Sequence, residues 1–299
     1  MSLRLEGTYT ALVTPFSEQA GQPIDWGAFD ALIEAQVGGG VAGVVPCGTT
    51  GECATLTPEE HRRVIERTVD RVKGRVQVIA GTGSNSTREA VGLSKDAERA
   101  GADAVMVIVP YYNRPSQEGL YLHFVEVARS VSLPVVVYNV PARTGVDLTA
   151  DTLARIAQAA PNVVAVKEAT GNVLRAQQIA RVLGDRMIVL SGDDGLTLPM
   201  IAVGARGVVS VTSNLLPADV VGATRLALEG RVDEARHAHL RLLVVHEAMF
   251  VEASPTPVKA ALAMSGVMEA TVRPPHAPCS EAGRRAVSIA LEVFARGAR

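Results

Sequence analysis

The sequence predicts a (β/α)8 barrel followed by a helical C-terminal region. Strand-like apolar runs alternate with helix-like runs, and about eight such strands occur between residues 8 and 212, as a closed barrel of this kind requires. The strands are rich in β-branched residues, which is typical of a parallel sheet covered by helices. No G-x-G-x-x-G sequence follows the first strand, and this disfavours a doubly wound open sheet. We place the barrel at residues 1–222 and a helical region packed on it at residues 223–299.

The individual elements follow from local patterns. We expect strands at residues 8–13, 76–80, 134–138, 163–166 and 187–190, three more strands in the later part of the junctions 40–45, 101–106 and 204–209, and helices at 26–37, 57–73, 223–251, 257–264 and 280–295. Gly40, Gly101 and Gly204 open three similar junctions, where a glycine can end a helix with a positive φ. In the second helix Thr57 is the expected N-cap, and Glu60 completes a capping box.

Composition excludes several classes of protein. A formal net charge of -2 provides no basic surface for nucleic acid or an anionic membrane. Hydrophobic residues make up 47%, yet no apolar run is long enough to cross a bilayer. The 3 cysteines are odd in number and unclustered, which disfavours both a disulfide framework and a metal site. These features predict a soluble, cytoplasmic globular protein without a metal site.

Lys167 is the central candidate for chemistry. It directly follows the apolar run 163–166, at the end of an expected buried strand. Burial disfavours a charged ammonium, so its pKa should fall. A neutral amine attacks carbonyl groups and can form a Schiff base. A lysine at this place could instead extend its ammonium into water.

Other polar segments also follow predicted strands, and in a barrel the carboxyl ends of the strands meet at one mouth. They are the segments GTTGE (48–52), PYYNRP (110–115), YNVPARTG (138–145), SGDD (191–194) and SVTSN (210–214). Each could be an ordinary turn or helix cap on its own. Together with Lys167 they would place hydroxyl groups, a guanidinium, two tyrosines and an amine at one mouth. The paired hydroxyls and free amides of GTTGE could hold a carboxylate.

In this order and spacing, the motifs GTTGE, YYNRPSQEG, YNVPARTG, VKEATG and SGDD closely resemble the dihydrodipicolinate synthases. These enzymes belong to the N-acetylneuraminate lyase superfamily of class I aldolases. The resemblance extends from Gly7 to about residue 295. It implies condensation of pyruvate with L-aspartate 4-semialdehyde in the diaminopimelate route to lysine. It further implies a homotetramer built as a dimer of dimers, and no cofactor other than the covalent Schiff base on Lys167.

The resemblance also implies roles for individual residues. Lys167 would form the Schiff base, and Tyr138 would donate and accept protons in a relay with Thr49 and with Tyr112 of a neighbouring subunit. Arg143 would bind the carboxylate of the second substrate. The remaining pyruvate-binding positions would be Thr50, Val209 and Gly192. In lysine-sensitive members an effector site matches Cys53, Ala54, His61, Asn85, Glu89 and Tyr111.

Two alternatives to the synthase remain open from sequence. A sibling aldolase could cleave a sialic acid or a 2-keto-3-deoxy sugar acid with the same lysine, because a shared fold does not determine the substrate. Such siblings tend to depart from the threonine pair and from YYNRPSQEG, both of which this chain keeps. A non-catalytic barrel is the other alternative, but it would be expected to lose Lys167 or Tyr138.

Overall fold

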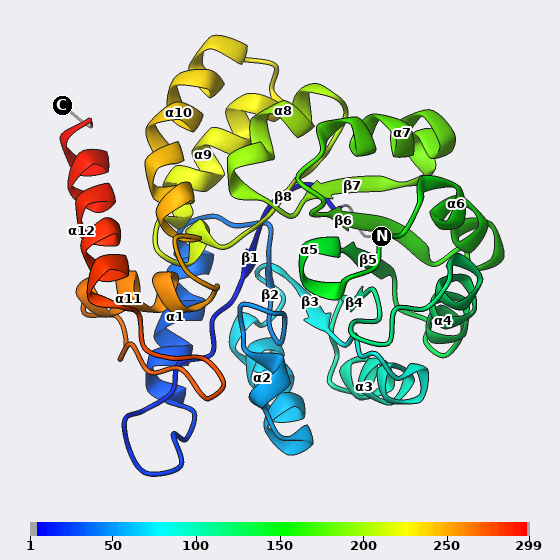
Figure 1. Ribbon diagram of the computed structural model, residues 1–299, viewed down its shortest axis with the longest axis horizontal. Coiled ribbons are helices and arrows are strands. Elements are labelled where there is room, and N and C mark those ends of the chain that lie inside the picture. The colour runs from blue at the N-terminus through cyan, green and yellow to red at the C-terminus, as the bar shows by residue number, and fades with distance from the viewer. Residues whose placement is uncertain (1–4, 298–299) are drawn as a thin grey trace.

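The computed structural model describes residues 5–297 and confirms the predicted barrel (Figure 1). Each strand pairs in parallel with the next, and β8 closes the barrel by pairing with β1. The strands are β1 (Gly7–Ala11), β2 (Gly43–Val45), β3 (Gln77–Gly81), β4 (Ala104–Ile108), β5 (Val135–Asn139), β6 (Val163–Glu168), β7 (Ile188–Ser191) and β8 (Gly207–Ser210). The expected strands are thus confirmed: the five with stated bounds shift by at most two residues at either end, and β2, β4 and β8 each begin three residues after the glycine of their junction.

Helices surround the barrel and continue into the C-terminal region. Those that follow the strands are α1 (Trp26–Gly38), α2 (Pro58–Val72), α3 (Thr87–Arg99), α4 (Gln117–Arg129), the one-turn α5 (Pro141–Thr144), α6 (Ala150–Ala159), α7 (Val173–Leu183), α8 (Thr197–Ala202) and α9 (Pro217–Leu228). The C-terminal helices are α10 (Val232–Ala248), α11 (Thr256–Met264) and α12 (Glu281–Arg296). Short 3-10 turns occupy Cys53–Thr55, Gly184–Arg186, Asp194–Leu196 and Thr212–Asn214.

The helix ends show which local predictions are correct. Gly40, Gly101 and Gly204 have φ of 78°, 86° and 106°, as the junction pattern predicts. Thr57 caps α2 in a capping box with Glu60. The expectation of one helix over 223–251 is wrong, because the chain turns at Gly230 with φ 74° and separates α9 from α10. Residue 222 lies inside α9, so the predicted boundary between barrel and C-terminal region falls within a barrel helix.

Alternation along the strands produces two apolar layers. Side chains such as Val136, Ala165 and Val209 fill the barrel interior, whereas Val135, Val137 and Val166 pack outward against the helices. A close approach inside the barrel requires glycine at position 43. A Cβ there would lie 2.7 Å from both the Tyr9 ring and the Gln77 carbonyl oxygen. The interior is therefore a packed core, and the site can form only where the strands end.

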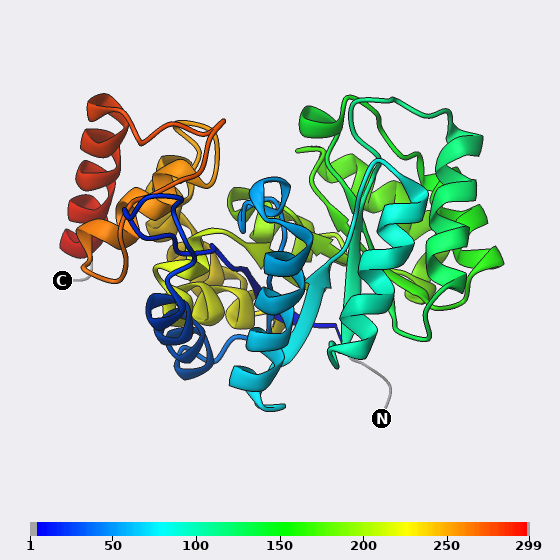
Figure 2. The ribbon, with the colours of Figure 1, turned by 90° about the horizontal axis from the view of Figure 1, so that it is seen from below.

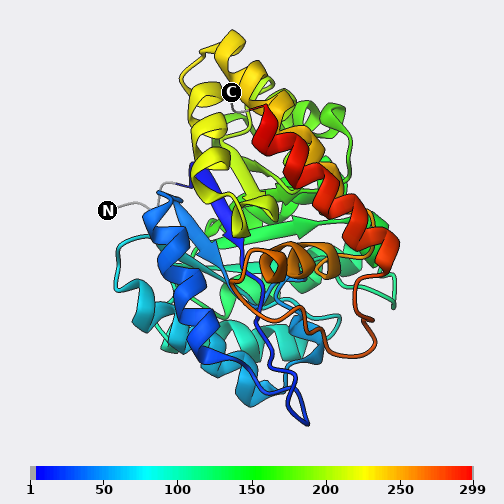
Figure 3. The ribbon, with the colours of Figure 1, turned by 90° about the vertical axis from the view of Figure 1, so that its left-hand side faces the viewer.

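The C-terminal helices gather on one side of the barrel, next to α1 and α9 (Figures 1 and 2). Seen from that side, α11 and α12 lie in front of the strands, with the chain between them looping alongside α11 (Figure 3). The Nζ of the buried Lys259 in α11 lies 2.5 Å from a carboxylate oxygen of Glu52, the last residue of the GTTGE loop after β2. The C-terminal region is thereby bonded to the loop that carries Thr49 and Thr50. Among the described residues, no helix is both long and apolar enough to cross a membrane.

Candidate active site

Lys167 and Tyr138 are neighbours across the β5–β6 ladder, and both point into the barrel at its carboxyl end. Lys167 is 6% exposed, and its Nζ lies 4.0 Å from the centre of the Tyr138 ring. Period-two alternation explains this arrangement, because Ala165 and Lys167 face inward while Val166 and Glu168 face outward. The predicted nucleophile thus lies buried beside the predicted proton donor.

Burial and nearby charges shift the pKa values of Lys167 and Tyr138 in opposite directions. Burial, reinforced by the nearby Arg143 cation, lowers the pKa of Lys167 to about 7, and the Asp194 carboxylate opposes this shift only in part. A substantial share of the amine is therefore neutral near physiological pH. Burial raises the pKa of Tyr138, against the opposing effects of Arg143 and a hydrogen bond with Thr49. Tyr138 therefore keeps its proton at neutral pH and can donate it.

The GTTGE segment forms a tight loop after β2. The amide of Gly51 donates to the Gly48 carbonyl at 3.1 Å, and that of Glu52 donates to the Thr49 carbonyl at 3.1 Å. Glu52 has a left-handed φ of 54°. Within residues 5–297, the amides of Thr49 and Thr50 donate to no other group. Two neighbouring free amides beside two hydroxyl groups can bind a small carboxylate.

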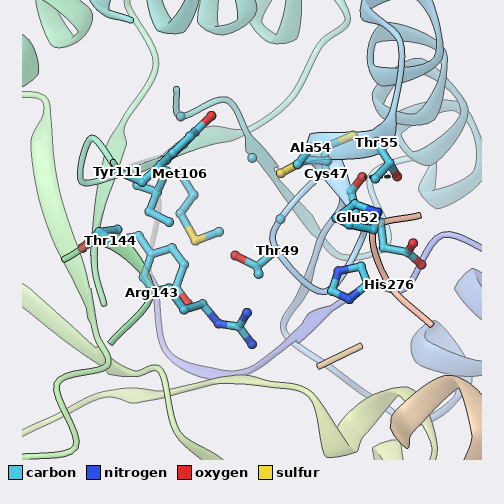
Figure 4. A pocket seen from close by; sticks show the side chains of 17 residues that line it. Cys47, Thr49, Glu52, Ala54, Thr55, Met106, Tyr111, Arg143, Thr144 and His276 are labelled. Carbon is cyan, nitrogen blue, oxygen red and sulfur yellow. Dashed lines mark hydrogen bonds between the residues drawn. The ribbon is translucent and has the colours of Figure 1, made fainter. Parts of the chain in front are cut away.

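A cavity of about 260 Å³ lies beside the GTTGE segment and Tyr138 (Figure 4). Its lining includes the predicted Thr49, Tyr138 and Arg143, and the Arg143 guanidinium points into the space beside the Thr49 hydroxyl (Figure 4). Gly81 also lines it, and a Cβ at that position would meet the Cys47 carbonyl oxygen at 2.2 Å. The cavity is not lined by four other predicted site residues, which are Lys167, Thr50, Val209 and Gly192. The first three of these are almost fully buried.

Glu168 has a supporting role, which the sequence alone left open. It faces outward with Asn139, whose Nδ2 donates to Glu168 at 3.3 Å and to Asp147 at 2.9 Å. Arg175 binds Asp147 at 2.6 Å, and Asn139 also accepts from the Leu148 amide at 3.1 Å. This network holds the chain that follows Arg143 against β6. Burial raises the pKa of Glu168.

In the SGDD and SVTSN segments, the side chains of Asp194 and Asn214 hold the barrel closed behind the mouth. Asp194 accepts hydrogen bonds from Ser210 and from the Val211 amide at 2.8 Å, which joins the end of β7 to β8. Asn214 donates to the Ala11 carbonyl at 2.7 Å and accepts from the Val13 amide at 3.1 Å. These hydrogen bonds join β7, β8 and β1 where the barrel closes. Gly192 fits close packing, since a Cβ there would lie 2.5 Å from the Ala169 Cβ.

Tyr112 does not join the other predicted relay residues within one chain. Its side chain is 89% exposed, and its backbone has a left-handed φ of 70°. A bulky residue in this conformation is uncommon and is typical of functional turns. The arrangement leaves Tyr112 available to a neighbouring subunit, as the resemblance implies.

Three of the six expected effector residues share the cavity of Arg143, and the other three lie outside its lining. Cys53, Ala54 and Tyr111 line the same cavity as Arg143. His61 is buried, with Nε2 2.9 Å from the Gly81 carbonyl oxygen, and burial lowers its pKa. Its Nδ1 has no partner within residues 5–297. Glu89 is exposed and accepts from Ser84 at 2.5 Å, while the Asn85 carbonyl accepts from Asn113 at 2.8 Å.

Several residues at the site were not predicted from the sequence. The most important are the Lys259–Glu52 pair and His276, which lines the cavity from the loop between α11 and α12. No local sequence pattern indicates that Lys259 and His276 contact this site, because both lie more than 200 residues after the GTTGE loop in the chain. No group of three or more His, Cys, Asp or Glu residues with metal-binding geometry occurs in the described part of the chain.

A parallel barrel with a buried, readily neutral lysine at its mouth is typical of the class I aldolases, and the fold and site place this protein among enzymes of that class. The sequence model of the Dihydrodipicolinate synthetase family matches residues 4–293. The chain belongs to this family, and it is a lyase with 4-hydroxy-tetrahydrodipicolinate synthase activity.

Individual relatives agree with this assignment. The 4-hydroxy-tetrahydrodipicolinate synthase of Sorangium cellulosum is 55% identical over 289 residues, which cover 97% of this chain and 96% of the relative. The solved synthase of Methylacidiphilum fumariolicum has a TM-score of 0.96 and 45% identity, and the match covers 98% and 97% of the two chains. The dihydrodipicolinate synthase of Acinetobacter baumannii, solved in complex with pyruvate, has a TM-score of 0.95 and 39% identity, with coverage of 98% and 99%. The synthase is therefore favoured over a sibling aldolase.

Proposed function

We propose that this enzyme condenses pyruvate with L-aspartate 4-semialdehyde through a Schiff base on Lys167. The observation that carries the proposal is the buried amine of Lys167, 4.0 Å from the Tyr138 ring and with a pKa lowered to about 7. The pyruvate complex of the Acinetobacter baumannii relative supports the choice of the first substrate. The lysine and diaminopimelate pathways use the product of this reaction.

The first half of the reaction activates pyruvate. The carboxylate of pyruvate binds at the Thr49 and Thr50 amides and hydroxyls, with Val209 and Gly192 beside it. The neutral amine of Lys167 attacks the ketone carbon, and Tyr138 gives its proton to the oxygen, which leaves as water. The resulting protonated imine makes the methyl group acidic, and loss of a methyl proton produces the enamine. Thr49 and the neighbouring subunit's copy of Tyr112 would carry protons between Tyr138 and solvent.

The second half forms the new carbon–carbon bond. Arg143 holds the carboxylate of L-aspartate 4-semialdehyde with its planar guanidinium, and the enamine carbon attacks the aldehyde. The aldehyde oxygen takes a proton from Tyr138 and becomes a hydroxyl group. The amino group of the second substrate then attacks the imine carbon and displaces Lys167, which closes the ring and frees the enzyme. No step needs a metal or a cofactor.

We further expect a homotetramer in a reduced cytoplasm. The support for the assembly is the family resemblance and the exposed, conformationally unusual Tyr112, which needs a neighbouring subunit to reach a relay. The support for the compartment is the three free cysteines, Cys47, Cys53 and Cys279. Sedimentation of the purified enzyme tests the assembly; a tetramer is expected, and a monomer would contradict the role of Tyr112 in a neighbouring subunit.

L-Lysine is the proposed feedback inhibitor, bound near Cys53, Ala54, Tyr111, Asn85 and Glu89, with His61 behind them. Three of these residues line the cavity that also contains Arg143, so a bound effector would lie close to the substrates. Such short-range coupling should produce partial inhibition.

A coupled assay with pyruvate and L-aspartate 4-semialdehyde tests the proposed function directly. The enzyme should form the cyclic product from these two substrates and should fail to cleave sialic acid or 2-keto-3-deoxy sugar acids. Turnover of a sugar acid with no condensation of the two named substrates would overturn the proposal.

A further inference from the structure

One polar side chain of the cavity has no part in the reaction described above. His276 is half-buried in the loop between α11 and α12, and it lines the cavity with Arg143 and Thr49. Arg143 and His276 come from different parts of the chain, and both point into the space around the Thr49 hydroxyl (Figure 4). Within residues 5–297, the ring nitrogens of His276 make no hydrogen bond to another residue. The imidazole is therefore free to bind a ligand.

The loop holds His276 in place before any ligand arrives. The His276 amide donates to the Arg273 carbonyl at 3.1 Å. The Arg273 guanidinium donates to Glu60 at 2.6 and 2.8 Å and to the Gln22 carbonyl at 2.8 Å, and it stacks 4.1 Å from the centre of the Phe16 ring. A side chain on such a fixed loop loses little freedom on binding, so each contact it makes contributes more to affinity.

The second substrate also needs an acceptor for its amino group. L-Aspartate 4-semialdehyde carries a carboxylate, which Arg143 takes, and an ammonium group, which needs an acceptor. Among the described lining residues, Glu52 provides the only carboxylate. Its two oxygens are already used, one by Lys259 Nζ at 2.5 Å and the other by the Arg273 amide at 3.0 Å. The side chain of Glu52 is also fully buried, so it is out of reach of a substrate.

We propose that His276 accepts a hydrogen bond from the amino group of the second substrate and so determines specificity for an amino-aldehyde. One nitrogen of a neutral imidazole is an acceptor, and it lies on the same cavity as the carboxylate-binding guanidinium. This inference rests on the proposed function, because it assigns a role toward the same second substrate. The contact would also hold the nitrogen that later displaces Lys167.

Succinate 4-semialdehyde tests the proposal, because it is the same carbon chain without the amino group. We compare the KM for L-aspartate 4-semialdehyde with the inhibition constant of succinate 4-semialdehyde in His276→Ala, His276→Gln and the wild-type enzyme. His276→Ala should raise the KM about tenfold or more, as expected for a bond to a charged donor, and leave the inhibition constant and the KM for pyruvate unchanged. His276→Gln keeps an acceptor and should recover much of the loss. His237→Ala, on the exposed face of α10, is the matched control.

Other outcomes would overturn the proposal. Equal weakening of both aldehydes would mean that His276 only shapes the cavity, and no change in either would mean that it does not contact the substrate. Reductive trapping of pyruvate separates this inference from the proposed function. A His276→Ala enzyme that traps pyruvate normally but keeps its preference for the amino-aldehyde refutes the role of His276 alone, whereas a wild-type enzyme that fails to trap pyruvate refutes the Schiff-base mechanism.

Discussion

The buried ion pair between Lys259 and Glu52 joins the C-terminal region to the GTTGE loop, so breaking it should lower the stability of the protein. The two charges are 2.5 Å apart, and neither side chain is exposed. Lys259→Met leaves the Glu52 carboxylate buried and unpaired, and such a loss costs about 3–5 kcal/mol. At roughly 2 °C per kcal/mol for a chain of this size, Tm should fall by about 6–10 °C. The KM for pyruvate should rise as well, since Glu52 ends the loop that carries Thr49 and Thr50.

Urea unfolding is compared at one fixed protein concentration, because the apparent stability of an oligomer depends on that concentration. The double variant Glu52→Gln/Lys259→Met should recover most of the stability, because it removes the unpaired charge and keeps an acceptor for the Arg273 amide. Arg296→Met is the control: its pair with Glu292 is exposed, so a change of at most about 1 kcal/mol is expected. A Lys259→Met protein within about 1 kcal/mol of wild type, or a double variant no more stable than the single one, would refute this reasoning.

Three further predictions concern substrates, subunits and regulation. Arg143→Ala should raise the KM for L-aspartate 4-semialdehyde by an amount equivalent to about 1.5–3 kcal/mol while changing that for pyruvate little; equal effects would assign Arg143 to the whole mouth. Mixing Tyr112→Phe and Lys167→Ala chains, each inactive alone, should restore activity in hybrid dimers, and no recovery despite proven subunit exchange would place the relay within one chain. Millimolar L-lysine should partly inhibit the enzyme, and Glu89→Ala should relieve this; full activity in lysine, or unchanged inhibition in the variant, would count against the effector site.

The barrel and the buried position of Lys167 could be predicted from the sequence because their signals are local. Period-two alternation identifies Lys167 as the last inward residue of β6, and three glycines mark helix ends where only a positive φ fits. The helix break at Gly230 was harder to predict, because the apolar pattern continues on both sides of it. The sequence places the SGDD segment at a strand end, but it does not show that Asp194 bonds to β8 and the residue after it.

The contributions of the C-terminal region lay beyond sequence reasoning. Lys259 resembles any helical lysine in the sequence, and its burial against Glu52 depends on how α11 docks beside the barrel. His276 lies in a proline-rich turn that sequence patterns mark only as a loop. Such long-range contacts appear only once the whole chain has folded.

The pH dependence of reductive trapping at Lys167 tests the central claim most directly. The enzyme is incubated with pyruvate and cyanoborohydride between pH 6 and 9, and the initial rate of labelling is followed by mass spectrometry of the digested protein. Because the pKa of Lys167 is lowered to about 7, the neutral amine and hence the labelling rate should rise through pH 7 and level off above it. The label should lie on the peptide that contains Lys167 and be absent from Lys167→Ala. A label on another lysine, or a rate that keeps rising toward the ordinary lysine pKa of 10.5, would contradict the account.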